Sequence, residues 1–164
     1  MHFKYHLMSR IMTTHPYSAS ARQAKKAAAE AVGIDEAYIG LMVESFYAQI
    51  RSDAMLGPIF NSRIKAWPEH LERMKQFWRS VLHNSGSFSG NPMLKHVAIP
   101  QIEAIEFNHW LALFKQTLAD TAPSEAARDL ILGRAHMIAD SLLTGIRIHR
   151  DGHLASRMKD VQHA

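Results

Sequence analysis

The chain has 164 residues, no cysteine, 47% hydrophobic residues and 21% charged residues. This length and balance are typical of one soluble globular domain with its own core, and they exclude a disordered or fibrous chain. The lack of cysteine excludes disulfides, thiolate nucleophiles, iron–sulfur clusters and haem attached through cysteine. Any bound metal must therefore be held by histidine or carboxylate side chains.

The formal net charge of +4 is concentrated at the N-terminus, where five basic residues precede the first carboxylate, Glu30. Because the rest of the chain is nearly neutral, we expect no nucleic-acid groove. The longest apolar run, 110–114, is far shorter than the roughly 20 residues that cross a bilayer. The first residues also lack the continuous apolar stretch of a secretory signal. We therefore expect a cytoplasmic protein without a membrane span.

Helical periodicity dominates the chain after residue 34, and the sustained alternation of β-strands is missing. Asp35 is the expected N-cap of the first helix, which ends at a turn-rich segment, 53–58. No core arc is expected before Asp35. We predict four long helices and one short helix, with the ranges 35–52, 67–86, 92–100, 101–120 and 123–152.

The pair Glu106-x-x-His109 is the motif that helical di-iron proteins use twice. A second copy is missing, and His109 points away from the apolar arc of its helix, so we expect a surface histidine beside an acid. A helical di-iron protein is kept as a distant alternative. His149 and His153 also have metal-like spacing, but we expect Gly152 to end the helix between them and leave a solvated terminus.

Three residues with polar tips lie on arcs that should face the core: Tyr47, His70 and Trp110, each on a different predicted helix. Taken singly, each is typical of core packing, with its polar tip bonded to a backbone carbonyl. His96 is different, because prolines on both sides hold its short segment rigid. A fixed imidazole is what a metal ligand requires.

Six fragments in order resemble the signatures of group III truncated haemoglobins, and the resemblance covers roughly residues 36–150. Single fragments of this kind are weak, but six in the family's order and spacing are specific. They are Phe46-Tyr47, Leu56-Gly-Pro-Ile-Phe60-Asn61, Trp67-Pro-Glu-His70, Gln76-Phe-Trp78, Leu94-Lys-His96 and Trp110-Leu-Ala-Leu-Phe114.

The resemblance implies an all-α fold, the two-over-two helical sandwich of truncated globins around haem b. The truncated globin domain would span residues 35–152, and residues 153–164 would form a C-terminal tail. Residues 1–34 would be an N-terminal extension, either flexible or a helical appendage. Whether that extension is a targeting segment, a misassigned start or a functional part stays open.

The resemblance also implies the roles of individual residues. His96 would be the proximal iron ligand, and Tyr47, His70 and Trp110 would line the distal side, where their donors can reach a diatomic ligand. Phe60 would pack on the porphyrin, and two cations would meet the haem propionates. The expected haem-binding residues besides His96 are Phe60, Arg73, Met74, Phe77, Trp78 and Lys95, with Arg73 and Lys95 as those cations.

From this resemblance we expect a haem b protein that binds dioxygen, nitric oxide and carbon monoxide. Donors to bound dioxygen slow its release, which suits nitric oxide dioxygenation or peroxidase-like chemistry better than transport. Because the chain lacks a Gly-x-Gly-x-x-Gly dinucleotide fingerprint, a separate electron-donating reductase is expected. The alternatives are a binding or sensing protein without turnover and, more distantly, an unrelated helical interaction protein.

Overall fold

The computed structural model describes residues 16–100 and 102–162, with side chains described from 18 to 100 and from 102 to 153. All regular structure in this part of the chain is helical, which confirms the expected all-α class. No helix in it is both long and apolar enough to cross a membrane. The helices are α1 (Pro16–Ala31), α2 (Glu36–Ser52), α3 (Leu56–Arg63), α4 (Trp67–His83), α5 (Pro92–Val97), α6 (Ala104–Thr121) and α7 (Glu125–Gln162).

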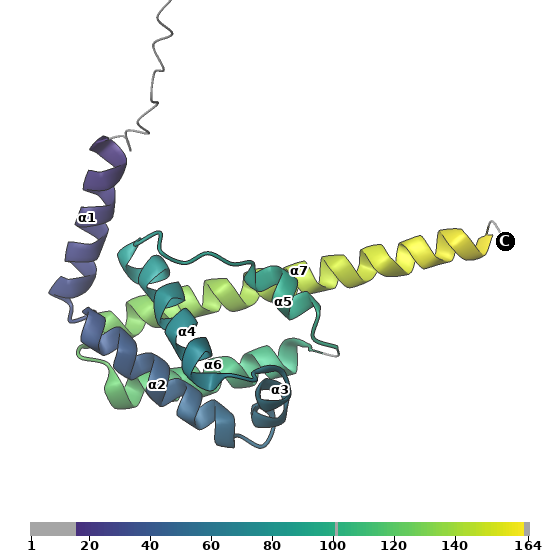
Figure 1. The fold of residues 1–164 in the computed structure, drawn as a ribbon, viewed down its shortest axis with the longest axis horizontal. Helices are drawn as coiled ribbons and strands as arrows, with labels where there is room; N and C mark the ends of the chain where they lie inside the picture. Colours follow the sequence, from purple (N-terminus) through teal and green to yellow (C-terminus); the bar gives the residue numbers. More distant parts are fainter. Residues whose placement is uncertain (1–15, 101, 163–164) are drawn as a thin grey trace, which may run out of the picture.

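Four long helices form two layers, α2 with α4 and α6 with α7 (Figure 1). Within this arrangement α2 packs on both α4 and α6, and α6 packs on α7. The short helices α3 and α5 lie against α2 and α7 respectively. The expected two-over-two sandwich is therefore confirmed, and the two short helices lie at the sides of the space that the layers leave between them.

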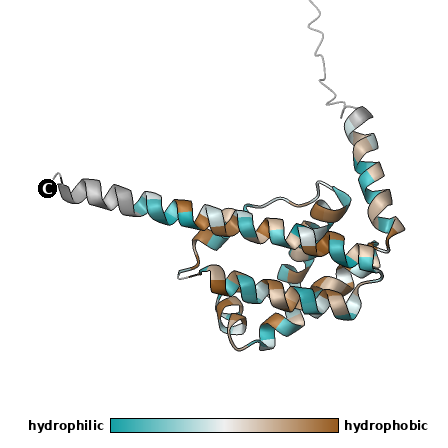
Figure 2. Ribbon diagram, turned by 180° about the vertical axis from the view of Figure 1, so that it is seen from behind, coloured by the Kyte–Doolittle hydropathy of each residue, from teal (hydrophilic) through white to brown (hydrophobic). Residues whose placement is uncertain are grey.

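The core follows the predicted helical spacing. On α2 the buried side chains recur every three or four residues, and the N-cap Asp35 accepts a hydrogen bond from the Tyr38 backbone N–H at 2.8 Å. Hydrophobic and hydrophilic residues are interspersed along α7 (Figure 2), and its buried residues Ala127, Ile131, Ala135 and Ala139 recur every four positions on one face. A second, smaller cluster joins the 97–102 segment, α6 and α7 through Ile102, Phe107, Ala139 and Ile146.

The segment 53–58 was expected to be a turn, but α3 begins inside it, at Leu56. The carboxylate of Asp53 accepts the backbone N–H groups of Met55 at 3.0 Å and Leu56 at 2.8 Å, which satisfies donors that a helix start leaves free. Pro58 lies in the first turn, where its missing N–H costs no helical hydrogen bond. Turn-forming residues here start a helix instead of separating two helices.

The expectation that no core residue precedes Asp35 is wrong for two residues. Ala29 and Ile34 are 3% and 0% exposed and belong to the main core cluster, and α1 packs on α4. The end of α1 has a Schellman motif: the N–H of Gly33 bonds the carbonyl of Glu30, and the N–H of Ile34 bonds that of Ala29. This turn directs Ile34 into the core.

The helix expected to end at Gly152 continues to Gln162 as part of α7 and projects beyond the other helices (Figure 1). Glycine in a helix interior costs only about 1 kcal/mol relative to alanine, so it need not end a helix. His149 and His153 therefore lie on one continuous helix, with ring centroids 5.0 Å apart, and are exposed. The expected solvated terminus between them is replaced by helix.

Gly33 has a φ of +94°, and an added Cβ would lie 2.7 Å from Cβ and Cγ of Pro123. We predict that Gly33→Ala lowers the free energy of unfolding by about 1–3 kcal/mol, from backbone strain and overpacking together. The control is Gly40→Ala, in the interior of α2, where the new methyl would meet no described atom within 4 Å apart from its own chain neighbours and helix backbone, and which should stabilise by roughly 0.5–1 kcal/mol. Denaturant titrations measure both. Equal effects of the two substitutions would contradict the prediction.

Candidate functional site

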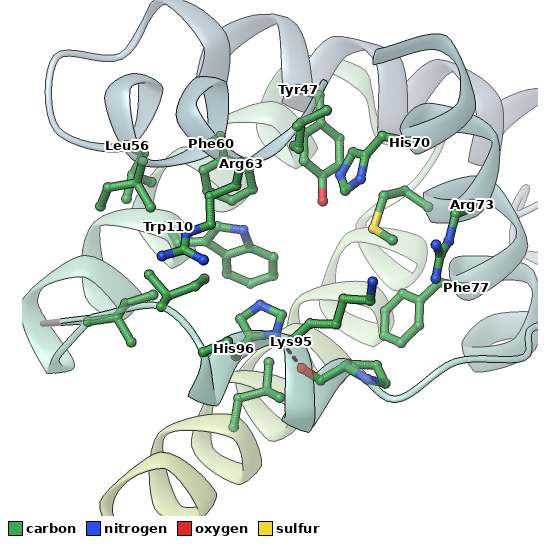
Figure 3. Close-up of a pocket in the computed structure, with 18 of the residues that line it drawn as sticks. Tyr47, Leu56, Phe60, Arg63, His70, Arg73, Phe77, Lys95, His96 and Trp110 are labelled. Carbon is green, nitrogen blue, oxygen red and sulfur yellow. Dashed lines mark hydrogen bonds between the residues drawn. The ribbon is translucent and has the colours of Figure 1, made fainter. Parts of the chain in front are cut away.

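A cavity of about 820 Å³ lies between the helical layers, lined by residues of six helices, α2 to α7. Its wall is mainly apolar, with a few polar side chains directed inward (Figure 3). The structure places all ten of the predicted site residues on this wall. They are Tyr47, Phe60, His70, Arg73, Met74, Phe77, Trp78, Lys95, His96 and Trp110.

His96 lies on α5, a single short helix with strong local capping. The Asn91 side chain accepts the backbone N–H of Leu94 at 3.0 Å, and Pro92 occupies the first turn. The Nδ1 of His96 lies 2.6 Å from the carbonyl oxygen of Pro92, an acceptor only, so Nδ1–H donates. This bond leaves Nε2 as the ring nitrogen that can bind a metal, and it fixes the plane of the imidazole.

Tyr47 lies on α2, across the cavity from His96, and its hydroxyl points into the cavity (Figure 3). Its ring makes edge contacts with Phe60 and His70, at centroid distances of 6.0 and 5.3 Å. Burial raises the pKa of the Tyr47 phenol above its ordinary value. The hydroxyl therefore stays protonated and is available as a hydrogen-bond donor.

His70 lies on α4 beside Tyr47 and faces the same space (Figure 3). Burial, and to a lesser extent the positive charge of Arg73, lowers the pKa of the His70 imidazole. Its Nε2 is buried and has no hydrogen-bond partner within the described part of the chain. A buried polar atom without a partner costs free energy, so its presence on a cavity wall points to a ligand that pairs with it.

Trp110 is held in the wall by other aromatic rings on α2 and α6. It stacks on Phe114 with centroids 5.4 Å apart and meets the edge of Phe46 at 5.4 Å. Phe114 stacks in turn on Trp78 at 5.2 Å. The indole is therefore fixed by core packing, and its N–H can serve only as a donor.

Four exposed cations also line the cavity, which places them at its openings: Arg63, Lys65, Arg73 and Lys95. Within the described residues none of the four forms an ion pair, whereas Lys75, Arg79, Arg128 and Arg150 do. The sequence interpretation missed Arg63 and Lys65, because Arg63 ends the unpredicted helix α3 and Lys65 follows it. Unpaired cations of this kind suit carboxylate groups at the edge of a ligand.

The residues present fit an iron porphyrin. The His96 imidazole faces the cavity from α5 with its Nε2 left for a metal, and the His70 imidazole faces it from α4 with a buried Nε2 that has no hydrogen-bond partner among the described residues. Apolar and aromatic side chains cover the space between them, as a flat apolar ring requires, and cations at the openings match its propionates.

The motif behind the di-iron alternative is explained by structure, because both Glu106 and His109 have structural partners. The Glu106 side chain accepts the Glu103 backbone N–H at 2.9 Å as part of a capping box at the start of α6. His109 is outside the cavity wall, and its Nε2 lies 2.7 Å from Oδ2 of Asp53. The acid beside His109 is thus Asp53, from another part of the chain, and no sequence signal links the two.

Comparison with known proteins supports this interpretation. The model of the family described as bacterial-like globin matches residues 27–144. The group 3 truncated hemoglobin ctb of Campylobacter jejuni is 36% identical over 110 residues, which are 65% of this chain and 86% of that protein.

Solved structures agree with the sequence matches. The crystal structure of group III truncated hemoglobin from Campylobacter jejuni superposes with a TM-score of 0.65 at 34% identity, over 69% of this chain and 91% of that one. The group II truncated hemoglobin of Bacillus anthracis has a TM-score of 0.58 at 23% identity, over 70% and 88%, and supports the fold alone. The chain therefore belongs to the bacterial-like globin family, as a haem-binding truncated haemoglobin of group III.

Proposed function

We propose that the chain holds haem b in this cavity through His96 and binds dioxygen, nitric oxide or carbon monoxide on the opposite side. One observation carries the proposal: two imidazoles face the same cavity, His96 with its Nδ1 bonded to the Pro92 carbonyl and His70 with an Nε2 that lacks a partner among the described residues. Because the sequence contains no cysteine, attachment through thioether bonds is excluded and non-covalent haem b is favoured.

When bound, haem would supply the iron that takes the diatomic ligand and exchanges electrons. The residues of the chain would orient that ligand. Tyr47 offers a phenol kept protonated by burial, His70 a neutral imidazole and Trp110 an indole N–H. Donors of this kind favour a ligand that carries partial negative charge, and they slow its release.

Slow release favours redox chemistry over transport, and we propose nitric oxide dioxygenation or peroxidase-like detoxification. Such turnover consumes electrons, which the chain has no evident means of obtaining itself. Its sequence lacks the dinucleotide fingerprint, and the described part forms a single helical sandwich around the cavity. A separate reductase is therefore part of the proposal. A sensing role without turnover is separated from it by the kinetics below.

The first test replaces the proposed iron ligand. We predict that His96→Ala abolishes the histidine-ligated spectrum of the haem-loaded protein and leaves helicity largely intact, because the helices bury apolar surface without the iron bond. His70→Ala is the matched control on the opposite wall and should keep that spectrum. Absorption, resonance Raman and circular dichroism spectra measure these outcomes. A normal histidine signature in His96→Ala would remove His96 from the role.

The second test removes single donors from the distal side. We predict that Tyr47→Phe and Trp110→Phe each speed dioxygen release about tenfold to a hundredfold, since a hydrogen bond to a charged acceptor is worth roughly 1.5–3 kcal/mol. The effects should not add in the double variant, because both donors serve one ligand. Tyr38→Phe is the control, since the Tyr38 hydroxyl bonds Thr121 at 3.2 Å, away from the cavity wall. Stopped-flow ligand displacement measures the release rates. Parental rates in both the Tyr47 and the Trp110 variant would contradict the proposal that these side chains donate to the bound ligand.

The third test concerns the electron source. We predict that the dioxygen-loaded protein, mixed with excess nitric oxide and NADH, forms about one nitrate per haem and then stops, because nothing returns an electron to the iron. Addition of a reductase should restore turnover. Many nitrates per haem without a reductase would reveal an electron-entry route within the chain. No nitrate at all would favour the binding or sensing role.

A further inference from the structure

One carboxylate joins three parts of the structure at the junction of α2 and α3. The Oδ1 of Asp53 accepts the backbone N–H groups of Met55 and Leu56, at 3.0 and 2.8 Å. Its Oδ2 lies 2.7 Å from Nε2 of His109, which is on α6. One carboxylate oxygen therefore accepts hydrogen bonds at the start of α3, and the other oxygen contacts a neighbouring helix, α6.

Few other contacts hold the helix α3 in position. Its N-cap residue, Met55, makes no side-chain capping bond, and its packing is chiefly against α2. The Asn61 amide donates to the Arg51 carbonyl at 3.2 Å, which again ties α3 to α2 alone. Within the described residues, Asp53–His109 is the side-chain hydrogen bond that connects the start of α3 to α6.

The position of α3 matters because this helix forms one side of the haem cavity. Leu56, Ile59 and Phe60 line the cavity from α3, and Phe60 meets the ring of Tyr47 at 6.0 Å between centroids. A shift of α3 would move Phe60 and loosen the contacts that hold a flat apolar ligand.

The charge of Asp53 suits this role. The Leu56 N–H, and less strongly the contact with His109, holds the pKa of the Asp53 carboxyl below its ordinary value. Asp53 is thus ionised at neutral pH and accepts all three hydrogen bonds. The side chains of Asp53 and His109 are 15% and 34% exposed, so the bond is partly shielded from water and stronger than a fully exposed one.

We propose that His109 is a positioning residue for the haem cavity: through Asp53 it fixes the start of α3 against α6 and so holds the Phe60 wall in place. The inference rests on haem binding by this cavity and is independent of the proposed redox chemistry. His109 does not line the cavity, so its influence on the haem passes through Asp53 and α3.

The test compares His109→Ala with His109→Gln in the haem-loaded protein, since the glutamine amide can donate to Asp53 as the imidazole does. Haem loss to an excess of a haem-scavenging apoglobin is expected to be about threefold to tenfold faster in His109→Ala, because α2 still holds α3 in part. His109→Gln should restore most of the parental rate. His136→Ala, an exposed histidine on α7, is the matched control and should lose haem at the parental rate.

Amide hydrogen exchange gives a second readout that does not depend on haem chemistry. Exchange at Met55, Leu56 and Gly57 should rise in His109→Ala and return toward the parental level in His109→Gln. Parental rates of haem loss and exchange in His109→Ala, or no rescue by glutamine, would overturn the proposal. The exchange measurement tests the Asp53–His109 contact directly and does not depend on haem. This inference can therefore be contradicted while the proposed function stands, and the reverse is also true.

Discussion

Four aromatic rings at the crossing of α2, α4 and α6 determine both the packing of the sandwich and one wall of the cavity. Phe114 meets Phe46 at 4.9 Å, Trp78 at 5.2 Å and Trp110 at 5.4 Å between centroids, so one ring sets the spacing of three helices. Large buried aromatics dominate the energetics of a core. Tyr47 follows Phe46 directly on α2, and Trp110 precedes Phe114 by one turn on α6. The same contacts that stabilise the fold therefore orient two of the polar groups on the wall.

The opposite side of the cavity is held by different and more local means. Helix α5 has no fully buried residue and packs on α7. The Met93 side chain of α5 lies over Gly145 of α7, where a Cβ would come within 2.3 Å of its sulfur. His96 is then oriented by its own helix, through the Pro92 carbonyl. The wall that carries Tyr47 and Trp110 is thus fixed by the core, whereas the segment that carries His96 is fixed by its capping bonds and by packing on α7.

The sequence predicted the long helices and the arcs of Tyr47, His70 and Trp110 because helical periodicity is a property of neighbouring residues. It could not show that these arcs meet His96 in one cavity, since that depends on how the helices cross, and here the resemblance to a family supplied what periodicity lacked. The start of α3 was missed for a local reason. Gly57 and Pro58 are typical of turns, and the helix start depends on the Asp53 carboxylate, which accepts the backbone N–H groups of Met55 and Leu56. Its partnership with His109 joins positions far apart in the chain and leaves no local pattern.

The charges of the site are separated by depth. Inside the cavity, burial raises the pKa of Tyr47 and lowers that of His70, and both shifts favour the uncharged form of the side chain. At the openings, Arg63, Lys65, Arg73 and Lys95 have no carboxylate partner within the described part of the chain. Two uncharged polar side chains can offer hydrogen-bond donors to a small neutral ligand at little desolvation cost, while the cations at the openings suit the anionic edge of a larger cofactor. This arrangement suits a site that holds an anionic cofactor and a neutral gas at once, because the gas is offered uncharged donors while the anionic edge of the cofactor is offered cations.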